Sequence, residues 1–415
     1  MMELATFRGL LGIGVLLAIA VFFSKKRQAI NFRTVGLAFI LQISLGAFVL
    51  YIPFGKDVLT SISGGVQEVI NSANVGIAFL FGGLGTDAMF TNGVGFVFAI
   101  RVLPVIIFFS SLIAVLYYLG IMQWVVKIIG GALQKLLGTS KPESLSATAN
   151  IFVGQTEAPL VIRPYIANMT QSELFAIMVG GLASVAGSIL AGYAGLGIDL
   201  KYLIAASFMA APGGLLMAKI IMPETEQEKI AQEDLITEDV GEQPSNVIDA
   251  AASGAASGLK LAVNVGAMLL AFIALIALLN SLVSGTASLF GFEGITIEWI
   301  LGYLFAPIAY IIGVPTAEML QAGSFIGQKI VVNEFFAYVN FVEIKDSLSA
   351  STQAIITFAL CGFANLSSIA ILLGGIGSMA PNRRHDIAKL GMKAMIAATL
   401  ANLMSAAIAG VFLSL

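Results

Sequence analysis

Charged residues are scarce in this sequence. Only 11% of its 415 residues are Asp, Glu, Lys or Arg, whereas 58% are hydrophobic. That charged share is less than half of what a soluble domain carries. The formal net charge of −3 also lacks the basic surplus that binding to DNA or RNA requires, so no nucleic-acid partner is expected. The composition predicts an integral membrane protein that lies in the lipid bilayer.

Cysteine and histidine are almost missing as well. Cys361 is the only cysteine, so no disulfide can form within the chain, and together with the single histidine, His385, it cannot make a zinc site. An intramembrane enzyme would need either a nucleophile beside a base or a set of metal ligands. The sequence indicates neither. We therefore expect a protein that is not an enzyme.

Long hydrophobic runs are abundant. A helix needs about 20 apolar residues to cross a bilayer, and eight runs of roughly that size are candidate spans: 9–23, 35–54, 95–120, 174–195, 202–222, 261–283, 353–378 and 391–413. The first run is followed, not preceded, by a basic cluster at residues 25–27, so we interpret it as a retained span and not as a signal peptide. The predicted fold is all-α, with eight transmembrane helices.

Two further stretches, 122–168 and 296–340, are apolar but interrupted by Gly, Pro and charged residues. Because irregular backbone is tolerated at membrane depth only when it is buried in protein, they are predicted to be re-entrant hairpins. The shorter stretch 66–81 mixes apolar and polar residues, and we expect an interfacial helix there.

Basic residues between the spans predict the orientation. They gather in three loops of the same parity, which we assign to the cytoplasmic side: Lys25, Lys26, Arg27 and Arg33; Lys127, Lys135, Lys141 and Arg163; Arg383, Arg384, Lys389 and Lys393. In a bacterial cell this places the protein in the inner membrane with both termini in the periplasm. The acidic stretch 223–246 falls on the cytoplasmic side and is interpreted as a solvated linker.

Two pairs of motifs recur in the same order along the chain. Residues 151–157 (IFVGQTE) resemble 324–329 (SFIGQK), and 180–189 aligns with 361–370. Three spans lie between the two hairpins, and an odd number means that the second copy enters the membrane upside down. Inverted repeats built from broken helices are typical of secondary transporters, whose sites lie near the membrane midplane.

This repeat divides the chain into four predicted regions. Residues 1–94 hold the N-terminal spans and the interfacial helix, and 95–222 hold span three, the first hairpin and spans four and five. Residues 223–257 form the acidic cytoplasmic loop. Residues 258–415 hold span six, the second hairpin and spans seven and eight.

Polar residues inside the predicted spans are costly and therefore candidates for function. The carboxylates of Glu157 and Glu334 lie in the two hairpins, and serine and asparagine side chains interrupt spans four and seven. Such a set suits a neutral solute with several hydroxyl and amide groups. Serine and asparagine can instead hold helices together, and for Ser188, Ser367 and Asn402 this structural interpretation is favoured.

Three motifs resemble those of a known family. Residues 327–338 (GQKIVVNEFFAY) contain a Gly and a Lys followed after three residues by Asn-Glu-Phe, 154–157 read GQTE, and 362–368 read GFANLSS. The chain resembles the concentrative nucleoside transporter family from about Asn31 to Leu415. The resemblance implies a homotrimer with eight spans per protomer, in which a scaffold part and a moving part take up nucleosides such as uridine by alternating access.

The resemblance also implies a binding site. The nucleobase would be contacted from the first repeat by Gln155, Thr156, Glu157 and Ile189, and the ribose from the second repeat by Glu334, Phe363, Asn365 and Ser368. Co-transported sodium would be held by Asn150, Val153, Ser184 and Val185. We expect symport with sodium; proton coupling is the main alternative, and a passive channel is a weaker one.

Overall fold

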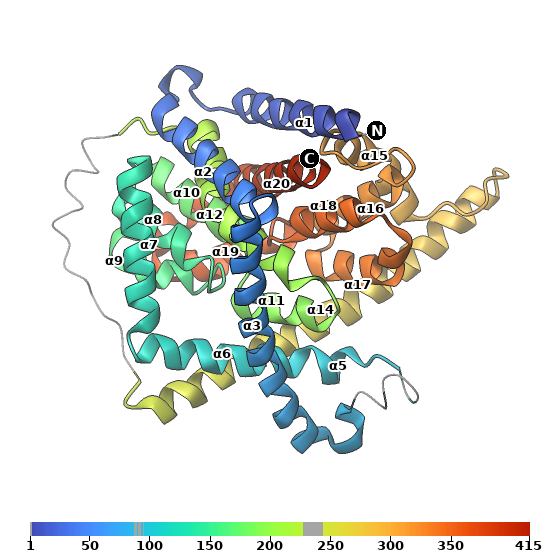
Figure 1. The fold of residues 1–415 in the computed structure, drawn as a ribbon, viewed down its shortest axis with the longest axis horizontal. Helices are drawn as coiled ribbons and strands as arrows, with labels where there is room; N and C mark the ends of the chain where they lie inside the picture. The colour runs from blue at the N-terminus through green and yellow to red at the C-terminus, as the bar shows by residue number, and fades with distance from the viewer. Residues whose placement is uncertain (1, 87–88, 90–92, 94, 227–243) are drawn as a thin grey trace.

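The computed structural model describes residues 2–86, 89, 93, 95–226 and 244–415 (Figure 1). All regular secondary structure in these ranges is helical, which confirms the predicted all-α class. Six acidic residues of the predicted linker lie outside the described ranges: Glu228, Glu233, Asp234, Glu238, Asp239 and Glu242.

Three helices come first in the chain: α1 (Met2–Phe22), α2 (Phe32–Leu50) and α3 (Pro53–Phe81). Asn31 begins α2 because its side chain accepts hydrogen bonds from the first backbone N–H groups of that helix. Pro53 starts α3 at a position where its missing N–H costs no hydrogen bond. The predicted interfacial stretch 66–81 forms the second half of α3, which continues α2 down through the middle of the view in Figure 1.

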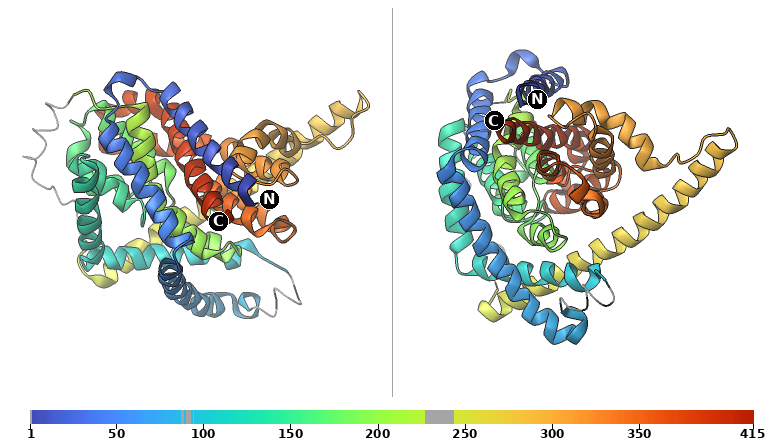
Figure 2. Two further views of the ribbon diagram at one scale, coloured as in Figure 1. Left: turned by 45° about the horizontal axis from the view of Figure 1, so that its top comes forward. Right: turned by 45° about the vertical axis from the view of Figure 1, so that its right-hand side comes forward.

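Two helices pack closely at the periphery. Short α5 (Phe98–Arg101) leads into α6 (Leu103–Tyr118), and α14 spans Val247–Ser288. The helices approach closely at Gly254 and Gly258, where a Cβ atom on either glycine would lie 2.7 Å from an atom of Ser110. With 42 residues, α14 is roughly 63 Å long at 1.5 Å per residue. It follows the outer edge of the molecule (Figure 2).

The first repeat contains two interruptions. Its elements are α7 (Ile121–Leu137), α8 (Lys141–Ala149), η3 (Ala158–Ile162), α9 (Arg163–Ile166), α10 (Gln171–Ala183), α11 (Gly187–Gly195) and α12 (Leu200–Ile221). Both α8 and α10 begin with a capping box, in which Ser140 pairs with Glu143 and Thr170 with Glu173. The chain is irregular between α8 and η3 and again between α10 and α11.

The predicted second repeat contains six helices: α15 (Ile297–Ile311), α16 (Met319–Val331), α17 (Glu334–Ile344), α18 (Ala350–Leu360), α19 (Leu366–Met379) and α20 (Arg384–Ser414). The remaining connections include four 3₁₀ turns, η1 (Arg27–Ala29), η2 (Gly82–Gly85), η4 (Lys345–Ser347) and η5 (Pro381–Arg383). The breaks α10/α11 and α18/α19 fall inside the aligned motifs 180–189 and 361–370. The inversion of the second copy across the membrane stays a prediction.

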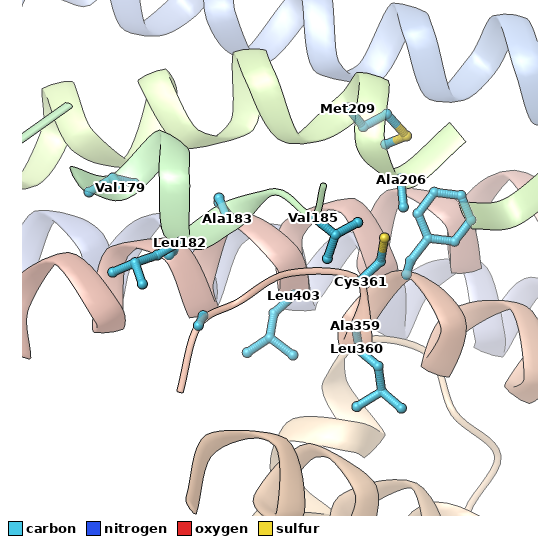
Figure 3. Packing of buried hydrophobic residues seen from close by; sticks show 14 of the residues in the cluster. Val179, Leu182, Ala183, Val185, Ala206, Met209, Ala359, Leu360, Cys361 and Leu403 are labelled. Carbon is cyan, nitrogen blue, oxygen red and sulfur yellow. The ribbon is translucent and has the colours of Figure 1, made fainter. Parts of the chain in front are cut away.

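The core consists of the central helices of both repeats. Buried residues make up 94% of the most apolar stretch in α10–α11 and in α12, but only 22% in α6 and α14. In Figure 3, side chains from α10, α12, α18 and α20 converge around the two breaks. The repeats therefore pack on each other, whereas α6 and α14 leave most of their apolar surface uncovered.

Six segments of the described chain are long and apolar enough to cross a membrane: Phe32–Leu50, Phe98–Tyr118, Gln171–Gly195, Leu200–Ile221, Val247–Ser288 and Pro381–Ser414. The other two predicted spans correspond to shorter apolar helices, Thr6–Phe22 and the pair α18 and α19. These helices indicate a multi-pass membrane protein.

The predicted cytoplasmic loops meet at one end of the molecule. Lys25 Nζ donates to Gln171 Oε1 at 2.9 Å, and a guanidinium nitrogen of Arg383 donates to the carbonyl of Met169 at 2.5 Å. At the opposite end of α1 and α20, the hydroxyls of Thr6 and Ser414 lie 2.8 Å apart, and the two ends of the chain lie side by side in both figures (Figures 1 and 2).

Candidate substrate and ion site

The two broken helices touch each other at their breaks. Ser184 follows α10 with an extended backbone (φ −108°, ψ 175°), and its carbonyl accepts a hydrogen bond of 3.2 Å from the N–H of Phe363 in the other break. The first hairpin joins them, because Gly187 N donates to Phe152 O at 3.0 Å. Backbone groups that would be paired inside a continuous helix are thus turned toward a shared region.

A buried polar cluster from α16 and α20 supports both breaks. Asn402 Nδ2 donates to Ala183 O at 2.7 Å and to Cys361 O at 3.1 Å, one carbonyl from each broken helix. Its Oδ1 accepts from Lys329 Nζ at 2.7 Å, and the same Nζ donates to a carbonyl of α18. Asn402 therefore links helices, as the structural interpretation of this residue in the sequence predicts.

Glu334 is the best-defined polar group of the region. It is the first residue of α17, where Asn333 caps the helix, and its side chain is buried. Its Oε1 accepts from the Tyr193 hydroxyl at 3.0 Å and its Oε2 from Asn365 Nδ2 at 2.8 Å. Carboxylates gain more from each hydrogen bond than neutral acceptors do, so these two donors fix the orientation of the Glu334 carboxylate.

Asn365 connects this carboxylate to α19. As the N-cap residue, its Oδ1 accepts from Ser368 N at 2.9 Å and from Ser367 Oγ at 2.7 Å. Asn365 and Ser368 are both buried, and Phe363 in the same break is partly exposed. The structure therefore brings three residues of the predicted ribose set together. Asn365 contacts the carboxylate of Glu334 and the backbone N–H of Ser368.

Three residues of the predicted base set, Gln155, Thr156 and Glu157, lie in the predicted first hairpin, between α10 and α19. Gln155 lies against α10, because a Cβ atom added to Gly181 of that helix would be 3.0 Å from the Cβ of Gln155. Thr156 lies against α19 in the same way, at Gly375. Gln155 is buried and its Oε1 has no hydrogen-bond partner in the described chain, whereas Glu157 is exposed and Ile189 is buried in α11.

The predicted sodium residues gather at the ends of α8 and α10. Asn150 ends α8, and its Nδ2 donates to Ser146 O at 2.9 Å, which leaves a buried Oδ1 without a partner among the described residues. Ser184 Oγ donates to Gly180 O at 2.9 Å, and Val153 and Val185 are buried. Uncharged oxygens at interrupted helix ends fit a hard monovalent cation.

Tyr193 contacts the predicted ribose set, and the sequence did not indicate it. Its ring stacks in the interior against Phe335 and Tyr338, with centroids 4.7 and 4.6 Å away, and its hydroxyl contacts Glu334. The sequence feature that could have indicated Tyr193 is its position four residues after Ile189 on α11. Residues at this spacing lie one helical turn apart on the same face.

Comparisons with known proteins identify the family. Three family descriptions match in succession: "Na+ dependent nucleoside transporter N-terminus" over residues 11–84, "Nucleoside recognition" over 99–199 and "Na+ dependent nucleoside transporter C-terminus" over 202–410. The chain belongs to the concentrative, Na⁺-dependent nucleoside transporter family. This confirms the resemblance seen in the three motifs, and it places the chain among transporters and not among enzymes.

Relatives of this family cover nearly the whole chain. "Nucleoside permease NupC" of Helicobacter pylori is 51% identical over 97% of both chains, and "Sodium/nucleoside cotransporter 1" of Mus musculus is 38% identical over 96% of this chain and 63% of its own length. A structure of CNTnw in an inward-facing, substrate-bound state is 59% identical, with a TM-score of 0.93 and 98% of both chains covered. Another, of a CNTnw variant in an outward-facing state, is 57% identical, with a TM-score of 0.95 over 100% of this chain and 99% of that one.

Proposed function

We propose that this protein is a symporter that takes up nucleosides such as uridine across the bacterial inner membrane, driven by a sodium gradient. The observation that carries this proposal is the Glu334 carboxylate, held by Tyr193 and Asn365 where the two broken helices meet. A carboxylate can accept hydrogen bonds from both hydroxyls of a vicinal diol, which is the group that a ribose presents.

The two repeats would divide the substrate between them. Glu334, Asn365 and Ser368 would bind the ribose, with Phe363 beside it. Gln155, Thr156 and Glu157 would read the base, packed on Ile189. The buried Oε1 of Gln155 supports this division because it has no partner in the described chain, and an unpaired buried acceptor gains from a ligand donor.

Sodium would be the second substrate, transported together with the nucleoside. Its proposed ligands are the backbone carbonyls of Asn150, Val153, Ser184 and Val185, with the hydroxyl of Ser184. The hydrogen bond from Phe363 to the carbonyl of Ser184 would couple this ion to the ribose side, because moving either break displaces the other. Binding of sodium would then favour the arrangement in which the substrate groups converge.

The transport cycle would be alternating access by a moving part within a homotrimer. The inward-facing structure of CNTnw and the outward-facing structure of a CNTnw variant support such a cycle for a close relative. Both termini are proposed to be periplasmic, which agrees with the ends of the chain lying together and an even number of crossings.

Uptake of radiolabelled uridine into proteoliposomes tests the proposal. Vesicles would carry an inward sodium gradient, a proton gradient with choline replacing sodium at both faces, or no gradient. We expect accumulation above equilibrium only with sodium. Accumulation in choline with a proton gradient would establish the proton-coupled alternative, and equilibration without accumulation in every condition would establish a channel. Glu334→Ala is the matched inactive control.

A further inference from the structure

A groove opens on the surface between α2 and α7, away from the site described above. Its volume is about 590 Å³, and seven residues line it: Phe32, Arg33, Gly36, Leu37 and Ile40 of α2, with Lys135 and Leu136 of α7. None of these residues belongs to the proposed substrate or sodium site. The groove therefore needs its own explanation.

One part of the lining is apolar and uncovered. Phe32 is 81% exposed, Ile40 60% and Leu136 45%. Within the groove Gly36 leaves open space, since no atom lies within 4 Å of where its Cβ would be. Because α2 is apolar enough to cross a membrane, an acyl chain suits this apolar lining better than water does.

The other part of the lining carries two positive charges. Arg33 and Lys135 are exposed, and neither side chain makes a hydrogen bond or ion pair within the described residues. Both line the same groove, Arg33 from the first turn of α2 and Lys135 from the last turn of α7. The basic residues of the connection between α1 and α2, Lys25, Lys26 and Arg27, precede Arg33 closely in the chain.

Charge and apolar surface are spaced as in a phospholipid. The seven steps along α2 from Arg33 to Ile40 rise roughly 10 Å at 1.5 Å per residue. That distance leads from the headgroup level into the hydrocarbon. Basic pockets between membrane helices on the cytoplasmic side are suited to anionic headgroups, and a zwitterionic lipid would leave the two charges uncompensated.

We propose that this groove binds one anionic phospholipid of the cytoplasmic leaflet. Arg33 and Lys135 hold its phosphate, and one acyl chain lies along Gly36 and Ile40. The lipid joins α2 to α7, which leads through three residues into α8 of the first hairpin. This inference does not depend on the identity of the transported solute.

Native mass spectrometry of the purified full-length protein, titrated with phosphatidylglycerol or phosphatidylcholine, tests the proposal. The double variant Arg33→Gln/Lys135→Gln removes both charges. Its matched control, Lys389→Gln/Lys393→Gln, removes two exposed charges of α20 on the same predicted side. Gly36→Leu fills the apolar part of the groove without changing any charge. Glycerol phosphate, which lacks acyl chains, separates a lipid site from a site for free phosphate.

We expect one phosphatidylglycerol per chain to bind more tightly than the rest in the wild type and in the α20 control. Removing Arg33 and Lys135 should weaken it roughly thirtyfold, as about 1 kcal/mol per basic residue at a membrane surface implies. Gly36→Leu should weaken it as well, and glycerol phosphate should not compete. Equal loss in the α20 control, equal binding of phosphatidylcholine, or full retention in both groove variants would each overturn the proposal.

Discussion

The Glu334 carboxylate lies in the protein interior with two side-chain donors, and one of them, Tyr193, can be removed cleanly. Tyr193→Phe keeps the ring between Phe335 and Tyr338 but deletes the hydroxyl that donates to Glu334 Oε1. A hydrogen bond to a charged group contributes about 1.5–3 kcal/mol. We therefore expect uridine affinity, measured by isothermal titration, to fall roughly ten- to a hundredfold. Because this bond lies within the protein, the melting temperature should fall as well, and a loss of stability with unchanged affinity would contradict a role in substrate binding.

The proposed division of the substrate makes a second prediction at the residue scale. Glu334→Gln should weaken every nucleoside yet reduce the penalty for 2′-deoxy and 3′-deoxy uridine, since the group that reads the diol is altered. Gln155→Ala should change the ranking among bases and keep that penalty. Each lost buried hydrogen bond costs about 1–3 kcal/mol. Competition assays with the analogue series measure both effects, and the opposite pattern would exchange the roles of the two repeats.

Some of these residues could be recognised in the sequence and others could not. Glu334 and Asn365 are conspicuous because an ionisable or amide group in an apolar segment is costly. Tyr193 is not, since an aromatic residue in an apolar helix usually packs, and here it packs and donates at once. Its contact with Glu334 depends on α11 lying beside α17. The two residues are 141 positions apart in the chain, so no local sequence pattern indicates the contact.

At the scale of the elements, breaks can be predicted better than lengths. Gly and Ser motifs at 180–189 and 361–370 mark the interruptions, because these residues weaken the helix locally, and both breaks fall there. The apolar run 261–283 indicated only the middle of α14, which starts at Val247. Its first turns are rich in Ala, Gly and Ser, and they are helical because Gly254 and Gly258 pack against α6, a contact invisible to hydropathy.

Asn402 ties these elements together, and its removal should be felt in both broken helices. Asn402→Leu leaves the carbonyls of Ala183 and Cys361 and one bond of Lys329 unsatisfied. At about 1–3 kcal/mol for each buried group left unpaired, the melting temperature in detergent should fall by several degrees and transport should be lost. Thr399→Val on the same helix is the control, because within the described residues the Thr399 hydroxyl bonds only to the carbonyl of Met395 in α20. Equal effects of the two variants would mean that α20 is merely sensitive to substitution.

At the scale of the whole molecule, two groups of helices differ in how far they are buried. α10, α12 and α20 are largely buried, whereas α6 and α14 are bound mainly to each other. Hydropathy could not predict this difference in burial, since it does not distinguish a span that faces lipid from one that faces protein. The division into a scaffold and a moving part stays a prediction from the resemblance.

Alternating access predicts that the site is reached from one side of the membrane at a time. Single cysteines at Thr156→Cys and Ser368→Cys, in a Cys361→Ala background, would be treated with an impermeant thiol reagent from either face of oriented vesicles. Labelling should come mainly from one side without substrate and shift with sodium and uridine, because the ligands favour different states of the same equilibrium. Ser245→Cys, exposed before α14, is the control that should react from the cytoplasmic side in every condition. If both site cysteines reacted from both faces at once while the control did not, the pathway would be a continuous pore and the coupled cycle would be wrong.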